Sequence, residues 1–238
     1  MIEGIFAVYK EEGVTSHDVV DAVRRLTRQK RVGHAGTMDP CAKGVLVIGV
    51  GRAATKTLYR VVGAEKEYVT RVKLGWRSTT DDREGKIEQV FPETEAGGAC
   101  GPLSTASSLP TEEQVRRVLA RFQGTIAQRP PAFSAIKVRG RAAYKLARAA
   151  KIVELPARPV EVKKIELLGY DWPYVDVRLV TGPGFYVRSF ARDLGEALGT
   201  GGYMAELERT RVGTYTKDQA VRRADLAAYL ATRRAARE

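Results

Sequence analysis

The chain is short of the residues from which metal centres and disulfide networks are built. Its 238 residues include two cysteines, Cys41 and Cys100, and two histidines, His17 and His34. Two cysteines make neither a disulfide framework nor a zinc cluster. We therefore expect no metal site, and the reducing cytoplasm is the simplest location for the protein.

Long apolar runs are missing as well. No stretch approaches the ~18 uninterrupted apolar residues of a membrane span. The N-terminal MIEGIFAVYKEEG lacks the basic and apolar regions of a secretory signal. The sequence has no glycine-rich phosphate loop and no nucleophile elbow, which argues against an NTPase and a serine hydrolase. Carboxylate chemistry remains open to it.

Positive charge is in excess. Forty Lys and Arg residues face 28 Asp and Glu residues, which gives a net charge of +12 and a pI near 9.8. Such an excess fits a polyanionic partner, and the planar guanidinium of arginine grips phosphates and stacks on bases, which favours RNA. The alternative is an ordinary protein from a proteome of generally high pI.

Hydrophobic periodicity predicts strands at 4–10, 44–50, 67–76, 160–168 and 174–181. Helices are expected after Ser16 as N-cap, after the capping box of Thr111 and Gln114, from about Phe185, and after a second capping box near Thr216. The first helix has an apolar stripe of Val19, Val20, Val23 and Leu26. Residues 77–86 read as a polar turn, 92–110 as a flexible surface insertion, and 129–148 as a basic loop leading into a helix.

The stretch RVGHAGTMDP, residues 31–40, combines two glycines with an Asp directly before a Pro. Asp before Pro is ordinary turn chemistry, so a purely structural reading of Asp39 is available. A nucleophilic aspartate must be ionised in a site that excludes water, and a nearby cation must offset the resulting rise in its pKa. Both readings stay open on the residues alone.

Over RVGHAGTMDPCAKGVLVIGVGRAATK the chain closely resembles the bacterial TruB-type tRNA pseudouridine synthases. The family signature is Gly-His-x-Gly-x-Leu-Asp-Pro-x-Ala-x-Gly-Val-Leu followed by Gly-x-Ala-Thr-Lys. Further similar blocks occur in order at 10–16, 66–68, 130–144, 182–188 and 193–195. The resemblance covers about residues 4–215 at fixed spacing, which makes it specific.

This resemblance implies isomerisation of the uridine at position 55 of the tRNA T loop to pseudouridine, with no cofactor and no metal. The base must be flipped out of the folded loop. The implied fold is α+β, with a mixed, largely antiparallel central sheet flanked by helices and loops. One catalytic domain would span 1–215, and 216–238 would form a short helical tail without a complete C-terminal RNA-binding domain.

Roles follow from the resemblance position by position. Asp39 matches the catalytic aspartate, Arg188 the arginine that pairs with it, and Tyr68 the tyrosine that stacks on the flipped base. Four positions match residues near the pocket or the RNA: His34, Lys10, Tyr186 and Lys137. Whether the aspartate attacks the sugar or the base does not follow. A surface arginine, a core tyrosine and packed or solvated side chains are the structural alternatives.

The sequence departs from the family pattern in places. Glu11 and Phe133 replace the usual Pro and Tyr, and Cys41 and Lys43 replace common Leu and Thr. We expect the tRNA T stem-loop as partner, a monomer, and no requirement for a protein partner. Two alternatives remain: an RNA-binding or tRNA-folding protein whose chemistry is secondary, and a synthase guided by a partner RNA.

Overall fold

The computed structural model describes residues 2–91, 108–134, 136–138, 141–142 and 155–235. They form two compact units, each described by itself: unit 1 comprises Met1–Val69 and Leu207–Glu238, and unit 2 comprises Thr70–Glu206. Within the described ranges, no helix is long and apolar enough to cross a membrane. Most of the expected insertion at 92–110, and the helix expected to follow the basic loop, lie outside these ranges.

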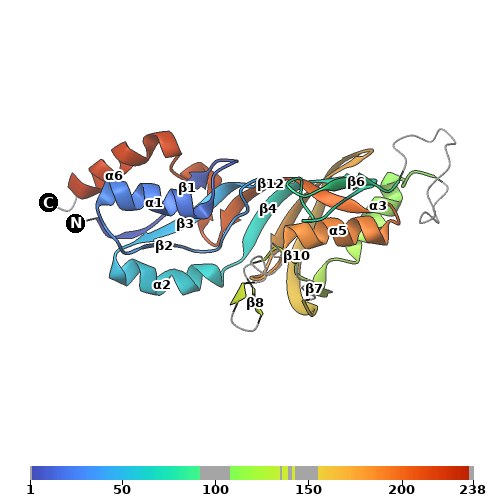
Figure 1. The fold of residues 1–238 in the computed structure, drawn as a ribbon, viewed down its shortest axis with the longest axis horizontal. Helices are drawn as coiled ribbons and strands as arrows, with labels where there is room; N and C mark the ends of the chain where they lie inside the picture. The colour runs from blue at the N-terminus through green and yellow to red at the C-terminus, as the bar shows by residue number, and fades with distance from the viewer. Residues whose placement is uncertain (1, 92–107, 135, 139–140, 143–154, 236–238) are drawn as a thin grey trace. The chain divides into compact units, whose positions relative to one another are not determined.

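The sheet of unit 1 is centred on β3 (Lys43–Val50). Strand β1 (Gly4–Lys10) and the short β2 (Val32–His34) pair with β3 in antiparallel fashion, whereas the end of β12 (Gly202–Val212) pairs with it in parallel. Strand β13 (Tyr215–Thr216) then pairs with β12. The strands expected at 4–10 and 44–50 are confirmed, and Figure 1 shows β1 and β3 side by side.

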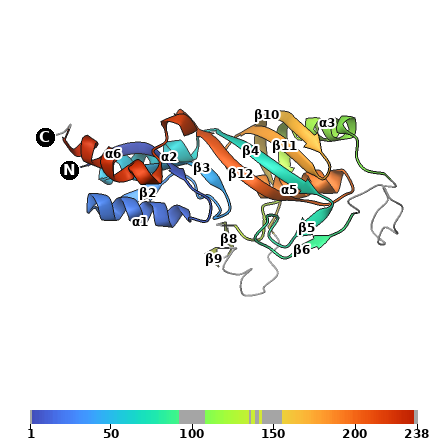
Figure 2. The same ribbon diagram turned by 90° about the horizontal axis from the view of Figure 1, so that it is seen from above.

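Helices cover both faces of this sheet. They are α1 (Ser16–Thr27), α2 (Arg52–Val62) and α6 (Leu226–Ala235), with 3-10 turns at Lys217–Gln219 and Arg223–Asp225. Along β1, Ala7 packs in a cluster with Leu58 of α2, while the neighbouring Phe6 meets Tyr229 of α6 with ring centroids 5.3 Å apart. Because successive strand side chains face opposite sides, α2 and α6 cover opposite faces (Figures 1 and 2).

Two details of unit 1 differ from the sequence expectation. Leu26 was expected in the buried stripe of the first helix, but its side chain is 47% exposed near the end of α1. The capping box of Thr216 and Gln219 is present, yet it begins only the short 3-10 turn, and the helix proper starts ten residues later at Leu226. A cap fixes where a turn begins and does not determine how far the helix continues.

Unit 2 contains a second strand order. Neighbouring strands in this order are hydrogen-bonded to each other: β4 (Lys66–Leu74), β11 (Tyr174–Thr181), β10 (Arg158–Asp171) and β7 (Gly124–Gln128). Two hairpins add β5 (Trp76–Ser78) with β6 (Ile87–Gln89), and β8 (Lys137–Val138) with β9 (Arg141–Ala142). The helices are α3 (Glu112–Ala120), with the expected capping box, and α5 (Val187–Ala197). Strands β4 and β12 have residues in both units.

The core of unit 2 includes a contact between helices α3 and α5. Phe190 of α5 is fully buried, and its ring lies 5.2 Å from that of Phe122, just beyond α3. The strand expected at 67–76 ends at Leu74, because Gly75 adopts a φ of +84° and turns the chain. Residues 77–86, expected as a polar turn, lie largely within the β5–β6 hairpin. The mixed, largely antiparallel strands and flanking helices confirm the expected α+β class.

Candidate active site

Asp39 lies in the connection between β2 and β3, and the backbone of this loop is bonded to the sheet. The N–H of Ala35 donates to the carbonyl of Val47 at 2.9 Å. On the other side of Asp39, the N–H of Ala42 donates to the carbonyl of Asp39 itself at 3.1 Å. The first bond ties the entry of the loop to β3, and the second closes a turn directly before β3, so the backbone on both sides of Asp39 is fixed.

Ser16 anchors the residue before Asp39. Its hydroxyl is buried, accepts a hydrogen bond from the N–H of Met38 at 2.9 Å and donates to the Met38 carbonyl at 3.3 Å. The prediction that Ser16 is the N-cap of α1 is therefore wrong. Thr15 is the N-cap, and its capping box is completed by Asp18. The serine is released from capping and holds the loop instead.

Lys10 anchors the residue after Asp39. Its ammonium is buried and donates to the carbonyls of Glu11 (3.1 Å), Val14 (2.6 Å) and Pro40 (3.3 Å). Burial lowers the pKa of Lys10 to about 8, although the charges of neighbouring acidic groups, Asp39 among them, oppose the shift. Lys10 supports the Asp39 loop in this geometry. The expectation that it contacts RNA stays a prediction.

Tyr68 lies in β4 of unit 1, in the electrostatic range of Asp39. Its ring is buried at an inward position of an alternating strand. Burial raises the pKa of the Tyr68 hydroxyl, Arg209 opposes this rise, and the charge of Asp39 adds to it. The phenol is therefore neutral at physiological pH. Unit 1 thus brings the expected catalytic aspartate and the expected stacking tyrosine into one cluster.

Arg209, in β12, belongs to the same cluster and was not expected from the sequence. The side chain is 2% exposed, and its Nε donates to the carbonyl of Val45 at 2.8 Å. Burial lowers the pKa of Arg209, while the interaction with Tyr68 and the charge of Asp39 oppose the shift. The sequence did contain a signal for Arg209, because it lies two residues after the apolar Leu207, and both side chains are on the buried side of β12. An arginine at such a position indicates a functional or bonded site.

His34 ends β2 and is half-buried. Its buried Nδ1 has no hydrogen-bond partner among the described residues. Burial lowers the pKa of His34, and the positive charges of Arg209 and His17 lower it further. The imidazole is therefore neutral at pH 7, so a contact with RNA would involve a hydrogen bond or stacking rather than an ion pair. That contact stays a prediction.

Arg188 lies in the first turn of α5 in unit 2 and is 5% exposed, which excludes the surface-arginine alternative. Its two terminal nitrogens donate to the carbonyls of Thr80 (3.2 Å) and Phe133 (2.9 Å). Its Nε lies 3.7 Å from a carboxylate oxygen of the buried Asp82. The guanidinium is thus held rigidly on unit 2. Its expected pairing with Asp39 stays a prediction.

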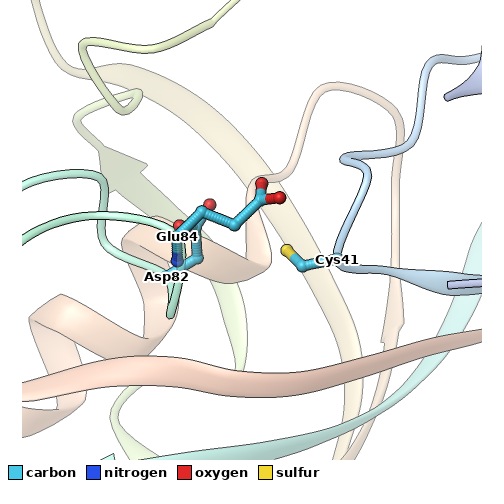
Figure 3. Close-up of side chains that lie close together, drawn as sticks. All are labelled: Cys41, Asp82 and Glu84. Carbon is cyan, nitrogen blue, oxygen red and sulfur yellow. The ribbon is translucent and has the colours of Figure 1, made fainter. Parts of the chain in front are cut away.

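Asp82 is itself oriented by its own turn. One carboxylate oxygen accepts from the Thr80 hydroxyl at 2.5 Å and from the N–H of Glu84 at 3.0 Å. Figure 3 shows the side chains of Asp82 and Glu84 on this turn after β5, and it also labels Cys41, which is buried in unit 1. The preceding Asp81 has a φ of +61° and bonds Arg192 of α5 at 2.8 Å. Two successive acids therefore tie one turn to one helix.

The last two expected residues also lie in unit 2. Tyr186 is the half-buried N-cap of α5, and its backbone exchanges hydrogen bonds with the side chain of Gln128 at 2.8 and 3.0 Å. The guanidinium of Arg158 lies 5.4 Å from the centre of its ring. Lys137 is in β8, but its side chain is outside the described part. Neither RNA contact is tested by this geometry.

Comparisons with known proteins bear on this arrangement. Residues 24–187 match the family described as TruB family pseudouridylate synthase (N terminal domain), and 188–238 match the tRNA pseudouridylate synthase B C-terminal domain. The chain is 43% identical to tRNA pseudouridine synthase B of Mycobacterium leprae over 94% of its own length and 68% of that protein. It is 44% identical to the same-named protein of Thermobifida fusca, covering 96% of this chain and 75% of that one.

Two solved structures share the fold. A Cbf5-Nop10-Gar1 complex contains a chain that is 28% identical with a TM-score of 0.70, over 95% of this chain and 54% of that one. An H/ACA RNP bound to a substrate RNA containing 2'-deoxyuridine gives 25% identity and a TM-score of 0.68, over 99% and 56%. The chain thus spans about half the length of these solved chains. The expected fold is confirmed.

Proposed function

The chain belongs to the TruB family of tRNA pseudouridine synthases, which are isomerases, and we propose on this premise that it converts uridine 55 of the tRNA T loop to pseudouridine. In this reaction the N-glycosidic bond breaks, the base turns, and a carbon–carbon bond forms to the same ribose. Because the product is an isomer of the substrate, no cofactor is consumed.

The observation that carries the proposal is the fixed loop around Asp39. Residues before and after it are bonded to three different elements: Ala35 to β3, Met38 to α1, and Pro40 to Lys10 of β1. Such a loop holds a carboxylate in one place before substrate arrives, and a group positioned in advance lowers the entropic cost of reaction. Asp39 then acts on the ribose or on the base, and both routes fit a fixed carboxylate.

We assign supporting roles to two further residues. Tyr68 offers a buried ring beside Asp39, which suits stacking against a flipped base. Arg188 offers a rigid guanidinium that can pair with the carboxylate. Flipping a base costs a few kcal/mol, which stacking and phosphate contacts can offset.

The surface of α2 supports a nucleic-acid partner. Arg52, Lys56 and Arg60 are exposed on this helix, which carries no acidic residue. Tyr59 is 66% exposed, and the guanidinium of Arg60 lies 5.8 Å from its ring centre. Cations interleaved with an aromatic ring suit a phosphate backbone with exposed bases. We therefore propose the tRNA T stem-loop as partner of a cytoplasmic enzyme that needs no other protein.

The test is pseudouridine mapping in tRNA and in a T-loop hairpin incubated with the purified chain. Asp39→Asn keeps the size of the side chain and removes its charge, so we expect folding and tRNA binding to persist and the rate to fall by more than about 10³-fold. Asp218→Asn, at an exposed position of unit 1, is the matched control and should retain full activity. Normal turnover by Asp39→Asn would refute the assignment.

Two readouts separate the alternatives: the cellular role of the Asp39→Asn variant, and modification of the hairpin by the purified chain. A protein whose chemistry is secondary to tRNA folding would keep its cellular role as Asp39→Asn. A guide-dependent synthase would leave the hairpin unmodified when incubated alone. Modification of the hairpin by the purified chain without an added guide RNA therefore removes the guide-dependent alternative.

A further inference from the structure

Arg209 is an arginine that the family match leaves without a role in this chain. It lies in β12, buried in unit 1, directly opposite Gly44 in the parallel pairing with β3. Burial of a guanidinium is costly, so a buried arginine is retained where its donors and its charge are used.

The donors of Arg209 bridge the two sides of the Asp39 loop. Nε donates to the carbonyl of Val45 at 2.8 Å, and one terminal nitrogen donates to the carbonyl of Gly36 at 3.2 Å. Gly36 precedes Asp39 and has a φ of +93°, whereas Val45 follows it on β3. The rigid fork of a guanidinium can hold two carbonyls in a fixed relation, which a lysine ammonium on a flexible stem does less well.

The charge of Arg209 is directed at the same residues. Asp39 and Tyr68 both favour its protonated form against the cost of burial. By reciprocity the positive charge of Arg209 favours the ionised form of the Asp39 carboxyl. Other titratable groups around this loop, on β1, the following turn, β2, β3 and β4, are Lys10, Glu12, His34, Cys41, Lys66 and Tyr68.

We propose that Arg209 is a positioning residue for the reaction: it clamps the Asp39 loop between Gly36 and Val45 and supplies, within unit 1, a cation that keeps the Asp39 carboxylate ionised. This inference rests on the proposed function of Asp39. It adds a second source of positive charge to the expected pairing with Arg188. Lys10 also acts on Asp39, so loss of Arg209 alone weakens the field without abolishing it.

Two variants separate the clamp from the charge. Arg209→Gln keeps an amide donor and removes the charge, whereas Arg209→Lys keeps the charge and loses the fork. Arg211→Gln is the matched control, because Arg211 lies two residues further along β12, is half-buried and is paired with Glu65 at 2.7 Å. The first readout is the titration midpoint of the Asp39 carboxyl, followed by NMR of ¹³C-labelled aspartate and identified by its loss in Asp39→Asn. The second is the single-turnover rate on saturating tRNA from pH 5 to pH 9.

We expect Arg209→Gln to raise the Asp39 midpoint by about one pH unit and to move the acid limb of the rate profile by the same amount. Arg209→Lys should leave the midpoint in place while the rate falls about tenfold or more at every pH, with tRNA affinity unchanged. Arg211→Gln should change neither readout. A purely structural role would lower rates without moving the midpoint or the limb.

An unmoved midpoint in Arg209→Gln would overturn the charge assignment, and a wild-type rate in Arg209→Lys would overturn the clamp. If circular dichroism shows that Arg209→Gln does not fold, the Lys variant decides alone, because a wild-type rate in Arg209→Lys contradicts the proposed clamp. If the wild-type chain makes no pseudouridine, the proposed function fails, and the NMR midpoints still report whether Arg209 acts on Asp39.

Discussion

At the residue scale, Lys66 bonds the C-terminal end of α2 and interacts electrostatically with Arg209 of the candidate site. It is buried at the start of β4, and its ammonium donates to the carbonyls of Val62 (2.7 Å) and Ala64 (2.6 Å), at and beyond the last turn of α2. A cation there satisfies carbonyls that the helix leaves unbonded. Burial lowers the pKa of Lys66 to about 8, and the charge of Arg209 lowers it further.

This shift predicts how stability depends on pH. Between pH 8 and about 10.5 the unfolded chain holds the Lys66 proton that the folded chain has lost, so the free energy of unfolding rises with pH in this window. Below pH 8 both states are protonated and the contribution is constant. We expect Lys66→Met to keep the part of the rise that Lys10 contributes and to lack the part that Lys66 contributes, on the order of 1–3 kcal/mol, measured by urea unfolding at pH 7 to 10. The exposed Lys217→Met should retain it, and parallel curves for all three proteins would contradict the shift.

The site residues differ in how far the sequence could predict them. Asp39 and Tyr68 are found by motif spacing, and their clustering in unit 1 agrees with the resemblance. The anchors Ser16, Lys10 and Arg209 bond to backbone carbonyls and N–H groups of distant segments. A backbone partner has no residue identity, so the sequence does not show what these side chains bond, and for Arg209 the available signal is its place on the buried side of β12.

At the scale of elements, Gly44 determines how closely β3 and β12 approach. It has a φ of +118°, and a Cβ at this position would lie 2.2 Å from the carbonyl oxygen of Arg209. The parallel pairing therefore has no room for a side chain here. Gly13 offers a contrast, with a φ of +79° and no atom within 4 Å of a Cβ.

Gly44→Ala should therefore destabilise the protein far more than Gly13→Ala. We expect a loss of roughly 2–6 kcal/mol from strain and overlap at Gly44, against about 1–2 kcal/mol from the left-handed backbone alone at Gly13. Denaturant unfolding of the two variants measures the difference. Equal losses would mean that β12 moves aside without cost.

The boundaries of the helices and strands show which local sequence signals determine where an element begins and ends. The strands at 4–10 and 44–50 were predicted nearly to the residue, because their apolar runs are bounded by glycine or charge. The predicted N-cap of α1 was wrong by one residue, although the sequence contains the capping-box pattern. Asp18 stands three residues after Thr15, whereas the apolar Val19 stands three residues after Ser16. The extent of α6 depends on tertiary packing of Leu226 and Leu230, which local pattern does not record.

For the whole molecule, the net charge of +12 is distributed unevenly. The cations of α2 have no acidic residue on their own helix, whereas Arg116 and Arg117 of α3 are paired with Glu112 (2.6 Å) and Glu113 (2.8 Å). A cation already paired at the surface releases fewer counterions when a phosphate binds. The two helices thus carry similar numbers of cations, but we expect those of α2 to contribute more to RNA binding than those of α3.

Paired substitutions of equal charge test this distribution. Lys56→Gln with Arg60→Gln should weaken tRNA binding and flatten the log–log dependence of affinity on salt by roughly 0.7 to 0.9 per lost phosphate contact. Arg116→Gln with Arg117→Gln removes the same charge from α3 and should change the slope little. Filter binding between 50 and 300 mM salt measures both, and identical slopes would show that only net charge matters.

The anchoring of the Asp39 loop has a consequence for synthesis of the chain. The loop is closed by Arg209, which is 173 residues away from its Gly36 acceptor and 164 from its Val45 acceptor. Contacts of such separation form late, after the intervening chain is available. A ribosome must therefore release β12 before the loop acquires its final shape, so in a nascent chain that already exposes RVGHAGTMDP the Asp39 carboxylate is not yet held in its final position.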